Sequence, residues 1–216
     1  MAAVPIKPEY GPTLGSLLSP RWRALPAPAR RAAAVAGALL AVGVAALVLA
    51  LLDASYSHSG RLPFSFRYRS LYRVAPEPGG YVRIQKHGAG GALQYSLAVN
   101  PIVLPTYAGE LSGEIPIYAA AYVRRHREHD PSFVLRGEGK AIVNSMPGYD
   151  VLYTTRLGGR PMYGRDILLV PERPGAREGV AIVMLTAPGV TKKVEGPNEV
   201  GSTGVLLHTL RSFSFG

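Results

Sequence analysis

The sequence predicts an α+β protein in which one transmembrane helix is followed by an antiparallel β-sheet domain with two packed helices. Three observations predict this class. Residues 32–52 form an uncharged apolar block, apolar and polar residues alternate from residue 64 onward, and two later segments, 112–129 and 204–211, have helical periodicity. The 216 residues leave one domain of ordinary size after the block.

The apolar block reads AAAVAGALLAVGVAALVLALL, without a charge, a polar side chain or a proline. A bilayer core about 30 Å thick needs roughly 20 helical residues to cross it. A buried core helix would seldom run so far without one polar position. A cleaved signal peptide usually has an apolar region of about 7–15 residues that starts closer to the N-terminus. We therefore expect an uncleaved single-pass anchor over 32–52.

Basic residues at the ends of the block predict its orientation, because Lys and Arg favour the cytoplasmic side. Arg30 and Arg31 adjoin the block, whereas Arg61 follows it at a distance. We expect the N-terminus inside and the C-terminal domain outside the cytoplasmic (plasma) membrane. The predicted parts are a disordered basic cytoplasmic tail, the span, a polar stalk and an extracytoplasmic α+β domain, over 1–31, 32–52, 53–62 and 63–216 respectively.

The first half of the domain predicts three strands and a helix. Phe64, Phe66 and Tyr68 alternate with polar residues, which is typical of a half-buried strand. With two further strands, over 81–87 and 93–99, they predict an antiparallel meander. The helix over 112–129 has Pro116 in its first turn, where proline is tolerated. Its expected apolar face comprises Ile117, Tyr118, Ala121 and Tyr122.

The second half predicts a longer run of strands. A hairpin turn is expected at Gly158-Gly159, and a polar loop over 187–203 precedes the final helix. Phe213 and Phe215 are expected to be pinned in the core. The predicted strands are 133–135, 140–143, 149–156, 163–170 and 180–186.

This order of elements resembles the PsbP-like fold, a group that includes the LpqN-type envelope proteins of actinobacteria. The resemblance covers about residues 63–216 and rests on four segments: IYAAAYVRR, Gly148–Tyr153, Tyr163–Leu169 and Leu210–Phe213. It implies the fold and a non-enzymatic binding or assembly role. It supplies no catalytic residue, because these families share no catalytic motif. This chain departs from LpqN-type lipoproteins in its predicted uncleaved span and its lack of a lipid-bearing cysteine.

Little in the sequence indicates catalysis or a cofactor. The chain has no cysteine, so thiolate chemistry and disulfides are excluded. His126 and His129 are three apart on the predicted helix, but neighbouring arginines repel a cation, so we interpret them as a solvated helix C-terminus. We expect no metal site, no cofactor and no enzymatic activity. The net charge of +10 comes from scattered basic residues, and we expect no nucleic-acid binding.

Tyrosine is the unusual feature, with 12 residues in the chain. Tyrosine suits binding surfaces because it offers contact area and a hydroxyl at low entropic cost. Asp150 and Asp166 lie on strands predicted to be adjacent, and we interpret them as partners in cross-strand ion pairs with nearby arginines. We expect a Tyr/Arg-lined cleft between sheet and helix as the partner or ligand surface. Its residues are Tyr118, Tyr122, Arg125, Tyr153, Arg156, Tyr163 and Arg165.

The predicted function is that of a membrane-anchored extracytoplasmic interaction or assembly module. It would bind a partner protein or an anionic envelope component, and we expect a Tyr/Arg surface without a buried polar constellation. A small-ligand or lipid-binding domain of the cell envelope is the alternative, and it predicts an apolar pocket of a few hundred Å³. An enzyme would instead gather titratable groups in such a pocket.

Overall fold

A computed structural model describes residues 26–173, 175–191 and 193–216, with the side chains of 49–51 excepted. The chain divides into two compact units between Ala50 and Leu51. The tail expected over 1–31 lies outside the described residues up to residue 25. The rest of it, from Ala27 onward, is helical.

The first unit contains one long helix, α2 (Ala27–Leu51). Its stretch Ala27–Val48 is long and apolar enough to cross a membrane, with a mean hydropathy of 2.1, and none of its most apolar window is buried. The core helix of a soluble domain would instead be mostly buried. At 1.5 Å per residue, the whole helix is about 37 Å long, which exceeds the thickness of a bilayer core.

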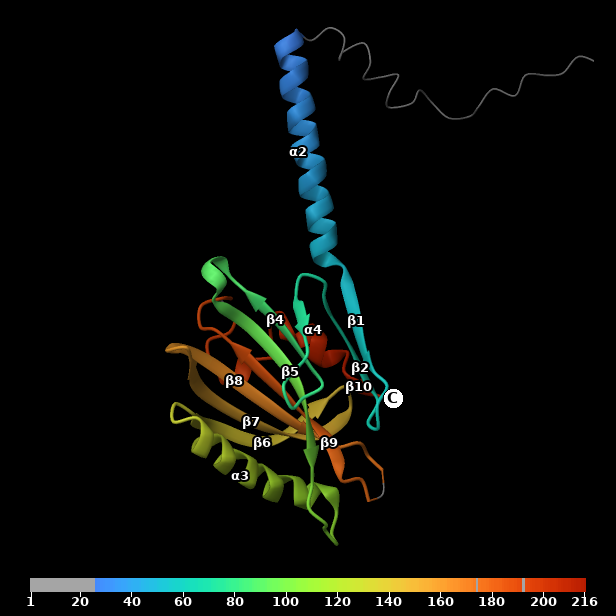
Figure 1. The fold of residues 1–216 in the computed structure, drawn as a ribbon, viewed down its shortest axis with the longest axis vertical. Helices are drawn as coiled ribbons and strands as arrows, with labels where there is room; N and C mark the ends of the chain where they lie inside the picture. The colour runs from blue at the N-terminus through green and yellow to red at the C-terminus, as the bar shows by residue number, and fades with distance from the viewer. Residues whose placement is uncertain (1–25, 174, 192) are drawn as a thin grey trace, which may run out of the picture. The chain divides into compact units, whose positions relative to one another are not determined.

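The second unit contains two antiparallel sheets (Figure 1). The larger has seven strands in the order β3-β4-β5-β9-β8-β7-β6, and the smaller has the order β1-β2-β10. The strands of the larger sheet are β3 (Arg73–Ala75), β4 (Val82–His87), β5 (Leu93–Val103), β6 (Val134–Val143), β7 (Met146–Leu157), β8 (Arg160–Leu169) and β9 (Glu178–Thr186). Those of the smaller sheet are β1 (Asp53–His58), β2 (Phe64–Arg69) and β10 (Ser214–Phe215). The α+β class is therefore confirmed.

The small sheet corrects two expectations. Residues 53–58 do not belong to a stalk, because they form β1 and pair with β2 along its whole length. The strand over 64–69 does not begin a meander with β4 and β5; it pairs with β1 on one side and with β10 on the other. Sequence alternation finds such a strand but carries no information about its partner.

The second half of the domain agrees more closely with the elements predicted from the sequence. The segments expected as two strands, 133–135 and 140–143, form the single strand β6, which bulges between Leu135 and Gly137. Gly158 and Gly159 form the turn between β7 and β8, with φ of 57° and 79°. Both values require a left-handed conformation, which glycine adopts without steric cost. The hairpin predicted at this position is confirmed.

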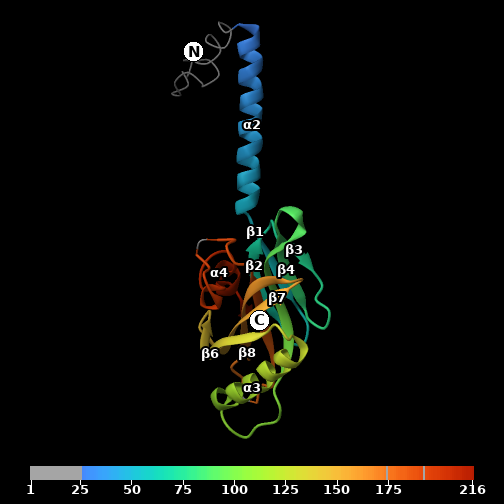
Figure 2. The ribbon, with the colours of Figure 1, turned by 90° about the vertical axis from the view of Figure 1, so that its left-hand side faces the viewer.

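The three longest elements outside the sheets are α2, α3 (Leu111–His129) and α4 (Leu206–Arg211). The last two pack on opposite faces of the seven-stranded sheet (Figures 1 and 2). Ile115, Ala119 and Val123 are the buried residues of α3. The expected apolar face was therefore wrong in part, since Ile117 is 66% exposed. The large core lies on the other face, where the small sheet, α4 and the polar loop meet the sheet.

The C-terminal residues of the chain pack into this core. Phe213 stacks against Phe64 and Phe66, with ring centroids 5.5 and 6.4 Å away. Asn144 donates a hydrogen bond from Nδ2 to the carbonyl oxygen of Phe213, at 3.2 Å. Phe215 is only half-buried. Of the two phenylalanines expected in the core, Phe213 is therefore inside it, and Phe215 packs against its edge.

Candidate functional site: a cleft between α3 and the sheet

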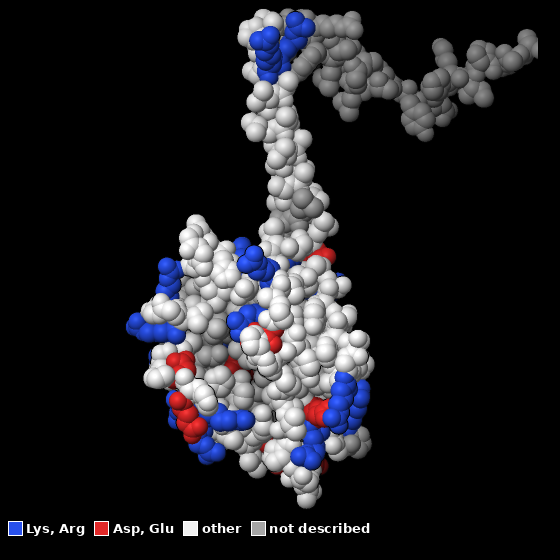
Figure 3. All heavy atoms as spheres, in the orientation of Figure 1, with Lys and Arg blue, Asp and Glu red and all other residues white. Residues whose placement is uncertain are grey.

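A cleft of about 490 Å³ lies on the α3 face of the seven-stranded sheet. It forms because α3 packs over β6, β7, β8 and one end of β5 and leaves β4 and the remaining parts of β5 and β9 uncovered on the same face. The loop between β3 and β4 borders the cleft on the side opposite α3, through Glu77. The space-filling view shows the surface hollowed on this face, with basic and acidic side chains around it (Figure 3).

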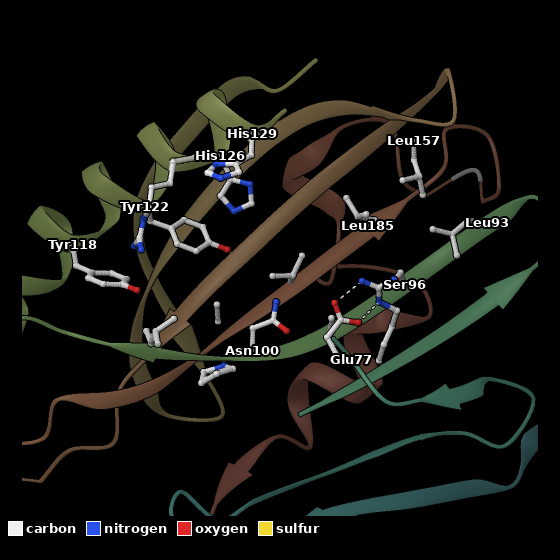
Figure 4. A pocket seen from close by; sticks show the side chains of 17 residues that line it. Glu77, Leu93, Ser96, Asn100, Tyr118, Tyr122, His126, His129, Leu157 and Leu185 are labelled. Carbon is white, nitrogen blue, oxygen red and sulfur yellow. Dashed lines mark hydrogen bonds and ion pairs between the residues drawn. The ribbon is translucent and has the colours of Figure 1, made fainter. Parts of the chain in front are cut away.

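One wall of the cleft comes from α3 and the other from the β3–β4 loop and β5 (Figure 4). Tyr118, Tyr122 and His126 are spaced by four residues, so one face of the helix presents all three. Opposite them lie Asn100 of β5 and Glu77 of the loop. The two walls therefore present aromatic and polar groups toward the same space.

The floor of the cleft is apolar, whereas its rim carries positive charge. Floor residues are Ala98, Ile102, Ala181, Val183 and Leu185. On the rim, Arg125 is exposed, and its guanidinium carbon lies 5.5 Å from the centre of the Tyr118 ring. The carboxylate of Glu77 is already occupied by an ion pair with Arg83. The cleft therefore offers apolar contact below and, above, a guanidinium that no carboxylate of the described residues pairs with.

A buried polar cluster lies behind the α3 wall. Asp166 of β8 is fully buried and accepts hydrogen bonds from the hydroxyl of Tyr122, at 2.9 Å, and from that of Tyr153, at 3.0 Å. Gly164 makes the arrangement possible, because a Cβ at this position would lie 2.3 Å from the Tyr153 ring. The cluster joins the helix to two strands through one carboxyl group.

Burial raises the pKa of the Asp166 carboxyl to about 7, although the hydrogen bonds from the two tyrosines act in the opposite direction. The same burial, with the nearby carboxyl, raises the pKa values of Tyr122 and Tyr153 well above their usual range. Both hydroxyls therefore stay protonated and act as donors. Desolvation outweighs hydrogen bonding here because no Lys or Arg among the described residues pairs with Asp166.

His126 differs from the expected solvated residue. It is half-buried and stacks on Phe133, and its Nε2 lies 3.6 Å from Oδ2 of Asp166. Burial lowers the pKa of His126, so the ring is mostly neutral at pH 7. His129 points elsewhere, with Nδ1 2.8 Å from the carbonyl oxygen of Arg125. Among the described residues no group of three or more His, Cys, Asp and Glu is arranged to hold a metal ion.

The predicted cross-strand ion pair exists for one aspartate only. Arg165 donates from Nε and Nη2 to the two carboxylate oxygens of Asp150, at 2.9 and 2.8 Å. Arg165 also donates to the carbonyl oxygen of Val200 and to Ser202, which ties β8 to the long loop. Asp166 follows Arg165 in the chain, but alternation along the strand turns it to the opposite face.

The seven residues expected to form one surface are divided between the two faces of the sheet. Tyr118, Tyr122 and Arg125 line the cleft. Tyr153 lies on the same face but is buried beneath α3. The other three lie elsewhere: Tyr163 packs against the large core, Arg165 is held by Asp150, and Arg156 donates to the carbonyl oxygen of Gly159 in the hairpin turn.

Two residues of the site were missed, and the sequence holds a signal for each. Asp166 directly precedes the apolar run 167–170, and the nearest positions on its own face of the strand, 162, 164 and 168, carry no basic residue. A carboxyl at such a position means either that the strand is wrongly assigned or that the carboxyl is buried and hydrogen-bonded. His126 continues the four-residue spacing of Tyr118 and Tyr122, which places it on the same face of the helix.

The sequence matches no protein-family model and no curated protein. Solved structures of other proteins share the architecture of the domain. LpqN of Mycobacterium tuberculosis, described as involved in cell envelope biogenesis, superimposes with a TM-score of 0.51 and 10% identity, covering 76% of this chain and 91% of LpqN. The cyanobacterial PsbP (CyanoP) of Synechocystis gives 0.53 and 14%, covering 76% and 92%. The resemblance of the globular domain to the PsbP-like fold, with LpqN among its neighbours, is thereby confirmed.

Proposed function

We propose that this chain is a membrane-anchored binding module that holds a segment of a partner protein, or an envelope component, in the cleft between α3 and the sheet. The observation that carries the proposal is the cleft itself. It combines an apolar floor with Tyr118 and Tyr122 on one wall and Arg125 on the rim. Aromatic residues and arginine around an apolar centre are the usual composition of binding hot spots.

In this proposal α2 is the membrane anchor. We infer that this helix stays as a single span, with the N-terminus inside and the domain outside the cytoplasmic membrane. Arg30 and Arg31 at its first turns support this orientation. The fold of LpqN, a protein involved in cell envelope biogenesis, supports a role in the envelope.

We favour binding over catalysis because the titratable cluster is closed to the cleft. Asp166 is fully buried, and its oxygens accept from two tyrosines of the same domain. Of this cluster, only Tyr122 and His126 reach the lining of the cleft. A reacting atom in the cleft could not approach the carboxyl without displacing α3.

Binding of a small ligand or lipid is the second candidate. Its support is the apolar floor and a volume of about 490 Å³, which is within the range of small-molecule sites. The exposed guanidinium of Arg125 would then favour a ligand with an anionic end. The two candidates differ in what a cross-linking group in the cleft should capture.

Topology can be tested with a protease-sensitive tag at the C-terminus. We expect the tag to be cleaved in intact spheroplasts, because the domain is proposed to face outward. A second tag at the N-terminus is the control and should be protected until the membrane is opened. Cleavage of the N-terminal tag with protection of the C-terminal one would reverse the proposed orientation.

Occupancy of the cleft can be tested by placing a photoreactive phenylalanine analogue at Tyr118 in the full chain. We expect a specific adduct in membranes, reduced at least fivefold by Arg125→Glu, since this change reverses the charge on the rim. Tyr163 is the matched control, because it is also a half-buried tyrosine but lies on the opposite face. A protein adduct supports the first candidate, and a lipid-sized mass shift supports the second. Equal adducts from both positions would exclude the cleft as the site.

A further inference from the structure

β6 is an edge strand whose length sets it apart from the opposite edge of the same sheet. It runs over Val134–Val143 and, within the described ranges, pairs only with β7, whereas β3 at the other edge is limited to Arg73–Ala75. Natural edge strands are usually kept short or broken by proline, because exposed backbone groups recruit further strands. Between its bulge and its turn, β6 has neither protection.

The hairpin turn determines which backbone groups of β6 point outward. Asn144 and Ser145 have φ of 46° and 69°, which makes a two-residue type I′ turn closed by the pair Val143 and Met146. That closing pair is hydrogen-bonded, and the pairs then alternate along the ladder. Ile142 therefore forms a non-hydrogen-bonded pair with Pro147, which agrees with the missing N–H of proline.

The same alternation makes two further pairs non-hydrogen-bonded, Lys140 with Tyr149 and Glu138 with Val151. Their backbone N–H and C=O groups point away from β7. In the described part of the chain, no other backbone segment bonds to them. Neither side chain makes an ion pair with a described residue, and both are exposed.

This edge is complementary to itself in one register. In an antiparallel pair of two β6 strands centred on Gly139, Glu138 lies opposite Lys140 of the second copy, and Lys140 lies opposite Glu138 of the second copy. Both pairs join outward-facing backbone groups, so each can exchange two hydrogen bonds. Shifting the centre to residue 138 or 140 instead opposes two like charges, which is destabilising.

Glycine at the centre suits this register. Gly139 would meet its own copy in a non-hydrogen-bonded pair, where the two Cα atoms come within about 4.5 Å of each other. With no side chain on either strand, the backbones approach without a clash. Three residues further along the strand, Ile142 is 78% exposed and would lose contact with water where the second copy covers the edge.

We propose that β6 pairs with β6 of a second copy of this chain, in an antiparallel register centred on Gly139, and so forms a symmetric dimer with a continuous sheet. A symmetric interface of this kind uses the same patch on both subunits. It lies on the edge of the sheet rather than in the cleft, so the two proposals can fail independently.

Disulfide trapping in the full chain tests the register, since the natural chain contains no cysteine. Gly139→Cys places two thiols across the two-fold axis, and a Cβ there meets nothing within 4 Å. We expect a disulfide-linked dimer in membranes under mild oxidation. Gly137→Cys is the matched control: its Cβ makes ordinary contact with Leu152, but in the proposed register its two copies lie far apart. Linkage at both positions, at neither, or at residue 137 alone would overturn the proposal.

Charge reversal on the Gly139→Cys background tests the side-chain pairing. Lys140→Glu should lower the yield of linked dimer at least fivefold, because it opposes two carboxylates on each side of the axis. Adding Glu138→Lys to it restores opposite charges and should restore the yield. A yield that is unchanged by the single reversal, or not recovered by the double one, would also overturn the pairing. Retention of the monomer's circular dichroism spectrum separates a lost interface from misfolding.

Discussion

Replacing Asp166 with asparagine is expected to stabilise the domain at pH 7 and above and to remove a large part of its pH dependence. The carboxyl has a pKa of about 7 in the folded protein, against an ordinary value of 3.8. Each unit of difference is worth about 1.4 kcal/mol, so ionised Asp166 costs the folded state on the order of 4 kcal/mol. Asparagine resembles the protonated carboxyl, and its amide can still bond to Tyr122 and Tyr153.

The numbers of protons bound by the folded and unfolded states determine how stability changes with pH. Between pH 3.8 and 7 the unfolded chain has already released the proton of Asp166, whereas the folded chain still holds it. The folded state therefore binds more protons, and stability falls as the pH rises through this window. We expect the stability difference between Asp166→Asn and the natural chain to be small near pH 4 and to grow by a few kcal/mol up to pH 8.

Urea unfolding followed by near-ultraviolet circular dichroism of tyrosine measures this difference. The signal reports mainly on the domain, because 11 of the 12 tyrosines lie in residues 53–216. Asp150→Asn is the matched control: it lies on the adjacent strand, and its bidentate pair with Arg165 is lost on substitution. It should destabilise the domain at pH 7 rather than stabilise it. A variant at Asp166 that is less stable than the natural chain at pH 8 would contradict the assignment of a costly buried charge.

The contrast between these two aspartates shows why the site could be predicted only in part. Periodicity placed both residues on neighbouring strands, which the structure confirms. Whether a strand residue faces solvent or a helix depends on which face the helix covers, and this is a property of the whole domain. Sequence proximity to Arg165 therefore suggested the same role for both, although only Asp150 shares a face with it.

The elements were predicted more reliably than their pairing for a similar reason. Gly158-Gly159 and the alternating segments around it specify a hairpin through local backbone conformation, and the structure has that hairpin. The partner of β2 depends instead on β1 and on β10, which come from distant parts of the chain. In α3, rotation of the apolar face from Ile117 to Ile115 follows from packing against β5 and β8, which local spacing does not reveal.

The structure has a cleft between α3 and the sheet, but only three of the seven residues expected to line it do so, and the composition of its walls was not foreseen. Tyrosine and arginine at 118, 122 and 125 follow from the helix period and occupy one wall. The second wall comes from Glu77 in a turn and from Asn100 late in a strand, and these positions become neighbours only through the order of strands in the sheet. A buried polar constellation was not expected, and Asp166 provides one.

Truncation of Phe213 to alanine is expected to destabilise the domain by about 3–5 kcal/mol, the usual cost of removing a buried aromatic ring. The ring is 1% exposed and lies against Phe64 and Phe66, so its loss leaves a cavity between the small sheet and the rest of the core. The backbone carbonyl of Phe213 also accepts from Asn144, the first residue of the β6–β7 turn. Loosening this segment should therefore reduce the order of that turn as well.

Phe215→Ala separates the effect of burial from that of the C-terminal position. Phe215 is two residues away and meets the Phe213 ring edge-on at 5.6 Å, but it is only half-buried. Its truncation should cost less than half as much in the same urea titration. Phe213→Leu should recover most of the loss if filled volume is what matters. Similar losses from both alanine variants would mean that the chain end is held by β10 pairing with β2 rather than by the aromatic core.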